Sequence, residues 1–321
     1  MHPVNEIANK PMKISVIIAT YNRAPALKDV LADLRGQTIQ PSLLEVIVVD
    51  NNSSDNTREI VNDLIASFGG RLKYYFEERQ GKTFALNKGI STAQGEILAF
   101  TDDDVRLDPR WLDCLLSCFK DYGCDAAGGR VLPAYPEKTP QWIKDNKCEL
   151  CGPIVLYDYG EQTKKYDVPM AEFVGANVAF MSTVFKEAGP FRTDLGPGQG
   201  TFGEDSEMVR RLYKMDKSLY YCAEALVWHP VDIKRMNLRY IARWNFDYGK
   251  FLGDRERQVI PKATVFYGRV PRYLIRELIF TIGRMVAKIL VKKDFLNYWI
   301  EFNRLRGRLE SFNGQKKNKK W

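Results

Sequence analysis

The sequence predicts an α/β fold, in which a mostly parallel sheet is flanked by helices and is followed by a helical, basic C-terminal extension. Over the first hundred residues, short β-branched apolar runs alternate with stretches of helical periodicity. Each run is apolar throughout, which is typical of strands buried on both faces. Such alternation implies βαβ crossovers and therefore parallel neighbours. Nearly unbroken helical periodicity from Arg235 onward predicts the extension.

Local signals bound the first elements. Pro25 opens the first helix, and Asp55 precedes the second, where its carboxylate can cap free N–H groups of the first turn. The expected strands span residues 13–19, 44–49, 72–76 and 97–100, and the expected helices span residues 25–35, 56–68 and 83–91.

After Trp111 the alternation loosens, because an irregular, proline-rich stretch runs from Pro133 to Pro169. Three glycines within residues 196–200 predict a mobile loop, since they carry no side chains to pack. The expected helices here span residues 111–119 and 204–215, and the expected strands span residues 125–132, 173–181 and 219–227.

The positive charge belongs to the C-terminal region. The net charge of +8 comes from 48 Lys and Arg against 40 Asp and Glu. Residues 269–321 hold 14 basic and 4 acidic side chains, a local net of +10, which leaves 34 basic and 36 acidic residues before them, a net of −2. This distribution predicts an anionic surface as the partner of the tail and gives the rest of the chain no nucleic-acid footprint.

Cysteine content and hydropathy indicate the cellular compartment of the protein. Six cysteines in 321 residues make no dense disulfide framework, which favours a reducing cytosol. The N-terminus lacks the basic-then-apolar order of a secretory signal, and no run approaches the roughly 20 apolar residues of a membrane-spanning helix. We therefore expect a cytoplasmic protein that does not cross a bilayer.

Residues 271–293 predict a basic amphipathic helix. Apolar side chains recur there at helical spacing, and basic residues interrupt them at multiples of four: Arg272, Arg276, Arg284, Lys288 and Lys292. Such a helix fits an anionic membrane interface, with the protein peripheral on the cytoplasmic face. The alternative is a helix that packs on the rest of the protein and leaves its basic face in solvent.

Polar side chains follow three of the expected strands. They are Thr20 to Arg23, Asp50 to Asn52, and Thr101 to Asp104. Ligands of open parallel sheets bind outside the carboxyl ends of the strands, so these groups predict one shared ligand-binding rim. Taken singly, each cluster is more typical of a turn after a strand; three clusters on one edge favour the ligand-binding rim.

Asp102, Asp103 and Asp104 form the sharpest motif. In extended chain, Asp102 and Asp104 project to the same side, and their mutual repulsion favours a bound cation. Hard oxygen donors suit Mg²⁺ or Mn²⁺, which also share phosphate oxygens as ligands. The alternative is a solvated acidic loop.

Five motifs in order resemble the family 2 glycosyltransferases of the GT-A fold, over residues 13 to about 230. They are Ser15 to Arg23, Val48 to Asp55, Gly81-Lys82 with Ala85 to Gly89, Asp102 to Asp104, and Gly203-Glu204-Asp205. The resemblance implies an inverting transferase that uses a nucleotide-sugar, usually a UDP-sugar, and a divalent cation.

The resemblance also implies site residues. Asp50 matches the position that meets the base, Asp102 the position near the ribose, and Asp104 the metal ligand. The implied nucleotide-binding set is Ala19, Thr20, Tyr21, Asn22, Arg23, Asp50, Asn52, Lys82, Asn87, Asp102 and Asp103. The implied metal set is Asp104, Asp102 and His229, although a lone histidine can equally be structural.

Two departures from the family pattern refine the expectation. Ala85-Leu86-Asn87 lacks the arginine that the family often has there, and Lys82 is the substitute positive charge. The segment Tyr240 to Trp244 lacks the glutamine of the processive Gln-x-x-Arg-Trp motif, so we expect transfer of a single sugar.

Gly203-Glu204-Asp205 opens a helix after the glycine-rich loop. Acidic residues in a first turn can simply complement the helix dipole. The functional interpretation is that Asp205, with Glu204 as the neighbouring candidate, removes the proton from the acceptor hydroxyl, while loop 196–203 closes over the donor and excludes water.

These expectations combine into one description. Residues 1–12 form an N-terminal arm, 13–232 the GT-A catalytic domain and 233–321 the helical, basic C-terminal region. The expected function is inverting transfer of one sugar to an acceptor hydroxyl in polysaccharide, glycolipid or lipid-linked glycan assembly. The alternative is a catalytically inactive nucleotide-binding scaffold recruited to membranes. The sequence leaves the oligomeric state open.

Overall fold

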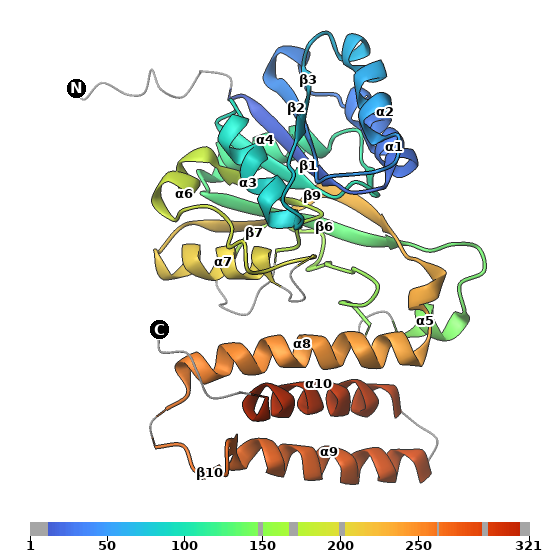
Figure 1. The fold of residues 1–321 in the computed structure, drawn as a ribbon, viewed down its shortest axis with the longest axis vertical. Helices are drawn as coiled ribbons and strands as arrows, with labels where there is room; N and C mark the ends of the chain where they lie inside the picture. The colour runs from blue at the N-terminus through green and yellow to red at the C-terminus, as the bar shows by residue number, and fades with distance from the viewer. Residues whose placement is uncertain are drawn as a thin grey trace. The chain divides into compact units, whose positions relative to one another are not determined.

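The computed structural model describes residues 12–146, 150–166, 173–198, 203–261, 263–290 and 295–314, without the side chains of residues 289 and 290. The chain forms two compact units (Figure 1). The first consists of Met1–Ala134 and Tyr157–Pro230, and the second of Tyr135–Leu156 and Val231–Trp321. The expected arm lies outside the described residues except for Met12, and so does the middle of the glycine-rich loop.

The first unit is built on one mixed sheet. Its strand order is β3-β2-β1-β4-β8-β6-β9-β5, with β7 paired to β9. The strands are β1 (Ile14–Thr20), β2 (Leu44–Asp50), β3 (Leu72–Phe76), β4 (Ile97–Thr101), β5 (Arg106–Leu107), β6 (Ala126–Ala134), β7 (Lys164–Lys165), β8 (Val178–Met181) and β9 (Leu219–Pro230). Strands β1 to β4 pair in parallel, whereas β8 runs antiparallel to β4 and β6. The predicted mostly parallel α/β sheet is confirmed.

Helices cover both faces of this sheet. The helices of the first unit are α1 (Ala24–Arg35), α2 (Thr57–Ile65), α3 (Lys82–Thr92), α4 (Trp111–Tyr122), α6 (Ser182–Glu187) and α7 (Glu204–Lys214). Successive residues of β1 point to opposite faces: Ile14, Val16 and Ile18 pack in a core with α1, α2 and α4, whereas Ile17 packs with α3, α6 and α7. The central strands are apolar throughout because both their faces are buried.

One expected strand is shorter than the sequence predicts. Only Val178–Met181 of residues 173–181 is extended, as β8. The residues before it turn, because the Asn177 N–H bonds to the Val174 carbonyl and the Thr101 hydroxyl bonds to the Ala176 carbonyl. This turn brings the main chain of Gly175 to Asp205, whose carboxylate accepts its N–H.

The second unit is helical, as predicted for the C-terminal region. It contains α5 (Gln141–Asp145), α8 (Leu238–Val259), α9 (Arg272–Leu290), α10 (Phe295–Asn313) and a short hairpin of β10 (Phe266–Tyr267) and β11 (Val270–Pro271). Helices α8 and α10 pack closely through glycines, since a Cβ on Gly249 would lie 2.0 Å from the Arg304 carbonyl oxygen. Within the described residues, no helix combines the length and apolarity needed to span a membrane.

Candidate functional site

The parallel register aligns the ends of β1, β2 and β4 at one rim of the sheet. Thr20 pairs with Asp50, and Thr101 pairs with Ile18 two residues before the end of β1. The loops that follow β1 and β2 hold each other, because the Asn22 side chain accepts the Ser54 N–H at 2.7 Å. The Asn22 N–H in turn bonds to the Ser53 hydroxyl at 2.9 Å. The polar residues after these strands therefore share one edge, as the sequence predicts.

Asp50 is buried at the end of β2, and both its carboxylate oxygens have partners. Oδ1 accepts the Ser53 N–H at 2.8 Å, and Oδ2 accepts the Tyr74 hydroxyl at 2.7 Å. Burial, reinforced by the hydrogen bond to Asp50, raises the pKa of Tyr74 far above its ordinary range. The hydroxyl therefore stays protonated and fixes the orientation of the carboxylate.

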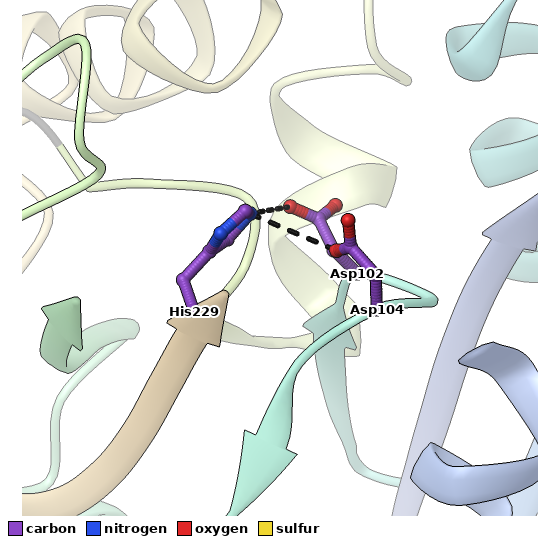
Figure 2. Close-up of side chains that lie close together, drawn as sticks. All are labelled: Asp102, Asp104 and His229. Carbon is purple, nitrogen blue, oxygen red and sulfur yellow. Dashed lines mark ion pairs between the residues drawn. The ribbon is translucent and has the colours of Figure 1, made fainter. Parts of the chain in front are cut away.

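Asp102, Asp104 and His229 point toward one another (Figure 2). His229 Nε2 lies 3.9 Å from Asp102 Oδ2 and 3.7 Å from Asp104 Oδ1, and the three candidate ligand atoms lie within 4.8 Å of one another. The two carboxylates follow β4, and the imidazole stands near the end of β9. Segments more than a hundred residues apart thus supply one three-ligand cluster.

Two details fit this cluster to a divalent cation. Asp104 Oδ1 is buried and has no hydrogen-bond partner among the described residues. His229 Nδ1 lies 2.9 Å from the Pro230 carbonyl oxygen, which can only accept, so Nδ1 carries the proton and Nε2 presents its lone pair. Two carboxylate oxygens and one imidazole nitrogen suit Mn²⁺ or Mg²⁺ with open positions left for phosphate oxygens.

Arg23 binds the outer side of the acidic cluster. Its guanidinium donates to Asp104 and lies 3.4 Å from Asp103 Oδ1. Burial works against the charged form, but Asp104 and Asp103 raise the pKa of Arg23 above its ordinary value. Burial raises the pKa of Asp103 to about 6. Arg23 therefore partly neutralises three contiguous carboxylates that would otherwise repel one another.

Lys82, the first residue of α3, pairs with another carboxylate of the cluster, that of Asp102. Its Nζ bonds to Asp102 Oδ1 at 2.5 Å. Burial opposes both charges, yet attraction to Asp102 raises the pKa of Lys82, and the Lys82 charge keeps the pKa of Asp102 below its ordinary value. Asp102 is thus ionised and offers Oδ2 toward His229.

Glu204 and Asp205 open α7 directly after Gly203, whose φ of 89° is the left-handed conformation that glycine tolerates. The Asp205 carboxylate accepts two main-chain N–H groups, from Gly175 at 2.9 Å and from Ser206 at 2.7 Å. Burial nevertheless raises the pKa of Asp205, and burial together with the Asp205 charge raises the pKa of Glu204 to about 7.

Gly175 separates Asp205 from Lys82. A Cβ built on Gly175 would lie 3.5 Å from Lys82 Nζ and 3.8 Å from Asp205 Oδ2. Lys82 therefore lies within reach of both acidic groups: it bonds to Asp102 directly and attracts Glu204 and Asp205 through space. The carboxylates after β4 and those that open α7 belong to one continuous site.

Hydrogen bonds hold the loop before α7 against α3. The Asn87 side chain bonds to both main-chain groups of Phe191, donating to the carbonyl at 2.8 Å and accepting the N–H at 3.0 Å. The Lys82 N–H donates to the Pro197 carbonyl at 3.1 Å. Gly196 then passes so close to Glu204 that a Cβ there would lie 3.0 Å from the Glu204 carboxyl carbon.

The remaining predicted residues lie at the same rim without contacting the cation cluster. Ala19 is partly buried at the end of β1, Tyr21 is half exposed, and Asn52 is exposed with φ of 66°. Sequence reasoning missed Tyr74 and Gly175, which orient Asp50 and Asp205. The sequence gives no signal for either role, because the pattern around Tyr74 predicts only a strand and Gly175 acts only through its main chain.

Comparison with known proteins identifies the family. The model for "Glycosyl transferase family 2" matches residues 15–189, more than half of the chain. The chain belongs to this family. The match runs from β1 through β4 and the acidic cluster to the end of α6, and it confirms the resemblance that the motifs predict.

Two relatives indicate what this family member is similar to. One is the GalNAc(5)-diNAcBac-PP-undecaprenol β-1,3-glucosyltransferase of Campylobacter jejuni, 37% identical over 65% of this chain and 62% of the relative. Another is the glycosyltransferase AglE of Haloferax volcanii, 29% identical over 68% of this chain and 66% of the relative. The chain thus matches just under two thirds of the length of each.

Solved structures confirm the fold. The mannosyltransferase PcManGT of Pyrobaculum calidifontis, in complex with GDP-Man and Mn²⁺, superposes with a TM-score of 0.62 at 19% identity, over 96% of this chain and 89% of the other. Residues 1–349 of TarS from S. aureus, in complex with UDP, give a TM-score of 0.54 at 16% identity, over 95% and 92%. The GT-A fold is therefore established.

Proposed function

We propose that this chain transfers a single sugar from a nucleoside diphosphate sugar to an acceptor hydroxyl, with inversion at the anomeric carbon. One observation carries the proposal: Asp102, Asp104 and His229 form a cation cluster, and Lys82 connects it to Asp205 within one rim of the sheet. Within the chain, residues 13–232 are proposed as the catalytic domain and residues 233–321 as a separate helical region.

The nucleotide is proposed to bind across the ends of β1, β2 and β4. Asp50, held by Tyr74 and Ser53, presents a fixed carboxylate toward the base, and Thr20 to Asn22 line the nucleoside. Asp102 lies near the ribose, and Lys82 adds positive charge where the family often has an arginine. We favour UDP, as the family resemblance implies; the alternative is a guanine nucleotide, since PcManGT, which has the same fold, was solved with GDP-Man.

A divalent cation, Mn²⁺ or Mg²⁺, would be held by Asp102 Oδ2, Asp104 Oδ1 and His229 Nε2. When bound, it supplies Lewis-acid neutralisation of the charge that develops on the departing nucleoside diphosphate. The chain's own contribution is a prepared set of ligands: Lys82 keeps Asp102 ionised, and the Pro230 carbonyl fixes the tautomer of His229.

The transfer step follows from the position of Asp205. Its carboxylate takes the proton of the acceptor hydroxyl as the acceptor oxygen forms a bond to the anomeric carbon. On the opposite face, the bond from that carbon to the diphosphate oxygen breaks, and the electron pair leaves with the nucleoside diphosphate. Glu204 is the neighbouring candidate, and its raised pKa marks the pair as the proton-handling group.

Among glycan acceptors, the class we favour is a lipid-linked glycan. The Campylobacter relative is named for an undecaprenol-linked substrate, and it is the more identical of the two relatives described. We place the reaction in the cytoplasm, as the cysteine content predicts, and at the face of a membrane, as the basic amphipathic helix predicts; we propose no nucleic-acid partner.

The rival is an inactive nucleotide-binding scaffold. It is tested by a screen of UDP-, GDP- and dTDP-sugars for hydrolysis or transfer, with and without Mn²⁺, on the full chain. We expect turnover of one nucleotide class that disappears with chelator and in Asp104→Ala, and that persists in Asp63→Asn, a change of an exposed acidic residue of α2 outside the site. Nucleotide binding without turnover of any donor would support the scaffold instead.

A further inference from the structure

Exposed apolar side chains gather in one part of the second unit. Eight large apolar residues are exposed between residues 259 and 286: Val259, Val265, Phe266, Tyr267, Ile279, Phe280, Ile282 and Val286. Soluble proteins commonly scatter such residues singly, whereas a contiguous group marks an interaction surface. We call Val265, Phe266, Tyr267, Ile279, Phe280, Ile282 and Val286 the α9 surface.

Helical spacing places four of these residues on one side of α9. Ile279, Ile282 and Val286 follow each other at intervals of three and four, and Phe280 lies beside Ile279. Ile279 is 64% exposed and Phe280 is 61% exposed. The opposite side of α9 is covered, because Leu274 and Leu278 pack in a cluster with Leu305 and Phe312 of α10.

The β10–β11 hairpin extends this surface at the start of α9. The Arg272 N–H bonds to the Val265 carbonyl at 2.8 Å, and the Arg272 guanidinium lies 5.8 Å from the centre of the Tyr267 ring. Both contacts fix the hairpin against the first turn of the helix. The exposed side chains of the hairpin therefore lie next to the first turn of α9.

Arginines border the apolar residues. Arg276 and Arg284 each lie one helical turn from Phe280, on either side of it, and both are exposed. In the part of the chain that the structure describes, neither has an ion pair with an acidic residue. The one acidic residue of α9, Glu277, is paired with Arg308 of α10 at 3.1 Å. The surface thus combines apolar side chains with uncompensated positive charge.

We propose that the α9 surface lies in the interface of an anionic membrane, with the helix parallel to the bilayer plane. A protein partner would need to bury apolar groups and arginines together, whereas a bilayer interface accommodates both at different depths: apolar side chains reach the acyl boundary, and arginine side chains extend to lipid headgroups. The net charge of +10 over residues 269–321 supplies the complementary electrostatics. This surface adds a lipid partner to the proposed function and does not depend on the donor.

The test measures sedimentation of the full chain with vesicles. One set consists of phosphatidylcholine alone, and the other is an equal mixture of phosphatidylcholine and phosphatidylglycerol. We expect binding to the mixed vesicles that weakens as salt rises. The double change Ile279→Ser with Phe280→Ser should lower the partition coefficient at least about tenfold, because both side chains leave the acyl boundary. Changing Arg276 and Arg284 to Gln should lower it on the order of tenfold on anionic vesicles alone.

Matched controls distinguish the effect of the α9 surface on vesicle binding from effects of overall charge and of folding. Lys28→Gln with Arg35→Gln removes two exposed charges from α1 of the first unit, and Ile233→Ser removes an exposed apolar side chain outside the surface. These variants should bind as the unchanged chain does. Because the substituted residues are exposed, every variant should keep its thermal unfolding midpoint.

Three results would overturn the inference. They are absence of binding to mixed vesicles, unchanged binding of the Ile279 and Phe280 double variant, and an oligomer that this variant dissolves, which would assign the surface to a second copy of the chain. Hydrolysis of the donor, measured without vesicles, should be equal in all these variants. Vesicle binding without donor turnover would contradict the proposed function and leave the membrane surface intact.

Discussion

Two acidic regions of the same rim have opposite electrostatic surroundings. Asp102, after β4, is bonded to Lys82, whose charge outweighs burial and keeps the pKa of Asp102 low. Glu204 and Asp205, at the start of α7, are buried side by side, and burial raises the pKa of both. The carboxylates of the two regions are therefore suited to different tasks. An ionised carboxylate can hold a cation, and a carboxylate with a raised pKa can accept a proton near neutral pH.

The largest expected effect comes from removing the proposed base. Asp205→Asn should lower kcat for transfer by about 10²- to 10⁴-fold, because the amide cannot take the acceptor proton. The nucleotide Kd, measured by calorimetry with Mn²⁺, should stay close to that of the unchanged chain. Asp63→Asn, in α2, serves as the control for loss of one exposed carboxylate outside the site. Joint loss of transfer and nucleotide binding would contradict the separation of roles.

Removing a proposed cation ligand from the loop after β4 should weaken metal binding. Asp104→Ala deletes the buried oxygen that has no hydrogen-bond partner, and it should weaken Mn²⁺ affinity at least about 100-fold. Electron paramagnetic resonance of Mn²⁺ measures this without any turnover. Asp103→Asn is the matched control, since Asp103 is not one of the three clustered ligands. Equal Mn²⁺ affinity in both variants would argue against the cluster as the cation site.

The raised pKa of Glu204 predicts how pH affects both rate and stability. Since Glu204 loses its proton near pH 7, kcat/KM should rise with pH through that range. The folded chain keeps a proton that an unfolded glutamate, with its ordinary pKa of about 4.5, has already lost. The free energy of unfolding should therefore fall as pH rises from about 4.5 to about 7, by the contribution of this group.

Glu204→Gln tests that prediction. It should move the acid limb of the rate profile to lower pH, because the group that titrates near pH 7 is then absent. It should also flatten the dependence of unfolding free energy on pH, measured by urea denaturation at several pH values. An unchanged acid limb and an unchanged slope would show that the pair at α7 does not titrate as proposed.

The smallest expected effect concerns the loop that leads to Glu204. Asn87→Ala removes both hydrogen bonds to Phe191 and should destabilise the chain by about 1–3 kcal/mol, measured by denaturant unfolding. If Asn87 acts only by positioning this loop, the KM for acceptor should rise while the nucleotide Kd stays constant. A weaker nucleotide Kd would instead support Asn87 as the nucleotide contact that the family resemblance implies.

The sequence predicts the framework of the site better than its fine geometry. The apolar runs of β1, β2 and β4 are buried on both faces, so their pattern predicts the strands, and the parallel register then aligns Thr20 with Asp50. Contacts that depend on the main chain leave no such pattern. The turn at Gly175, which gives Asp205 one of its hydrogen bonds, lies where the sequence predicts a strand.

Charge pairing was also only partly predictable. Lys82 is expected as a positive charge for the nucleotide, but its bond to Asp102 depends on how α3 meets the loop after β4. The sequence also does not predict that Tyr135–Leu156 belongs to the second unit. Ile143, Leu150 and Ile154 pack in that unit with residues about a hundred positions later, and the proline-rich stretch carries no pattern that indicates such contacts. Long-range packing decides both cases.

The central claim is that one cation site lies between the loop after β4 and the end of β9, next to the proton acceptor at α7. The most direct measurement is anomalous diffraction from crystals of the full chain grown with Mn²⁺ and UDP. We predict one manganese peak within coordination distance of Asp102 Oδ2, Asp104 Oδ1 and His229 Nε2. A manganese peak bound elsewhere, with these three side chains left free of metal, would contradict the account.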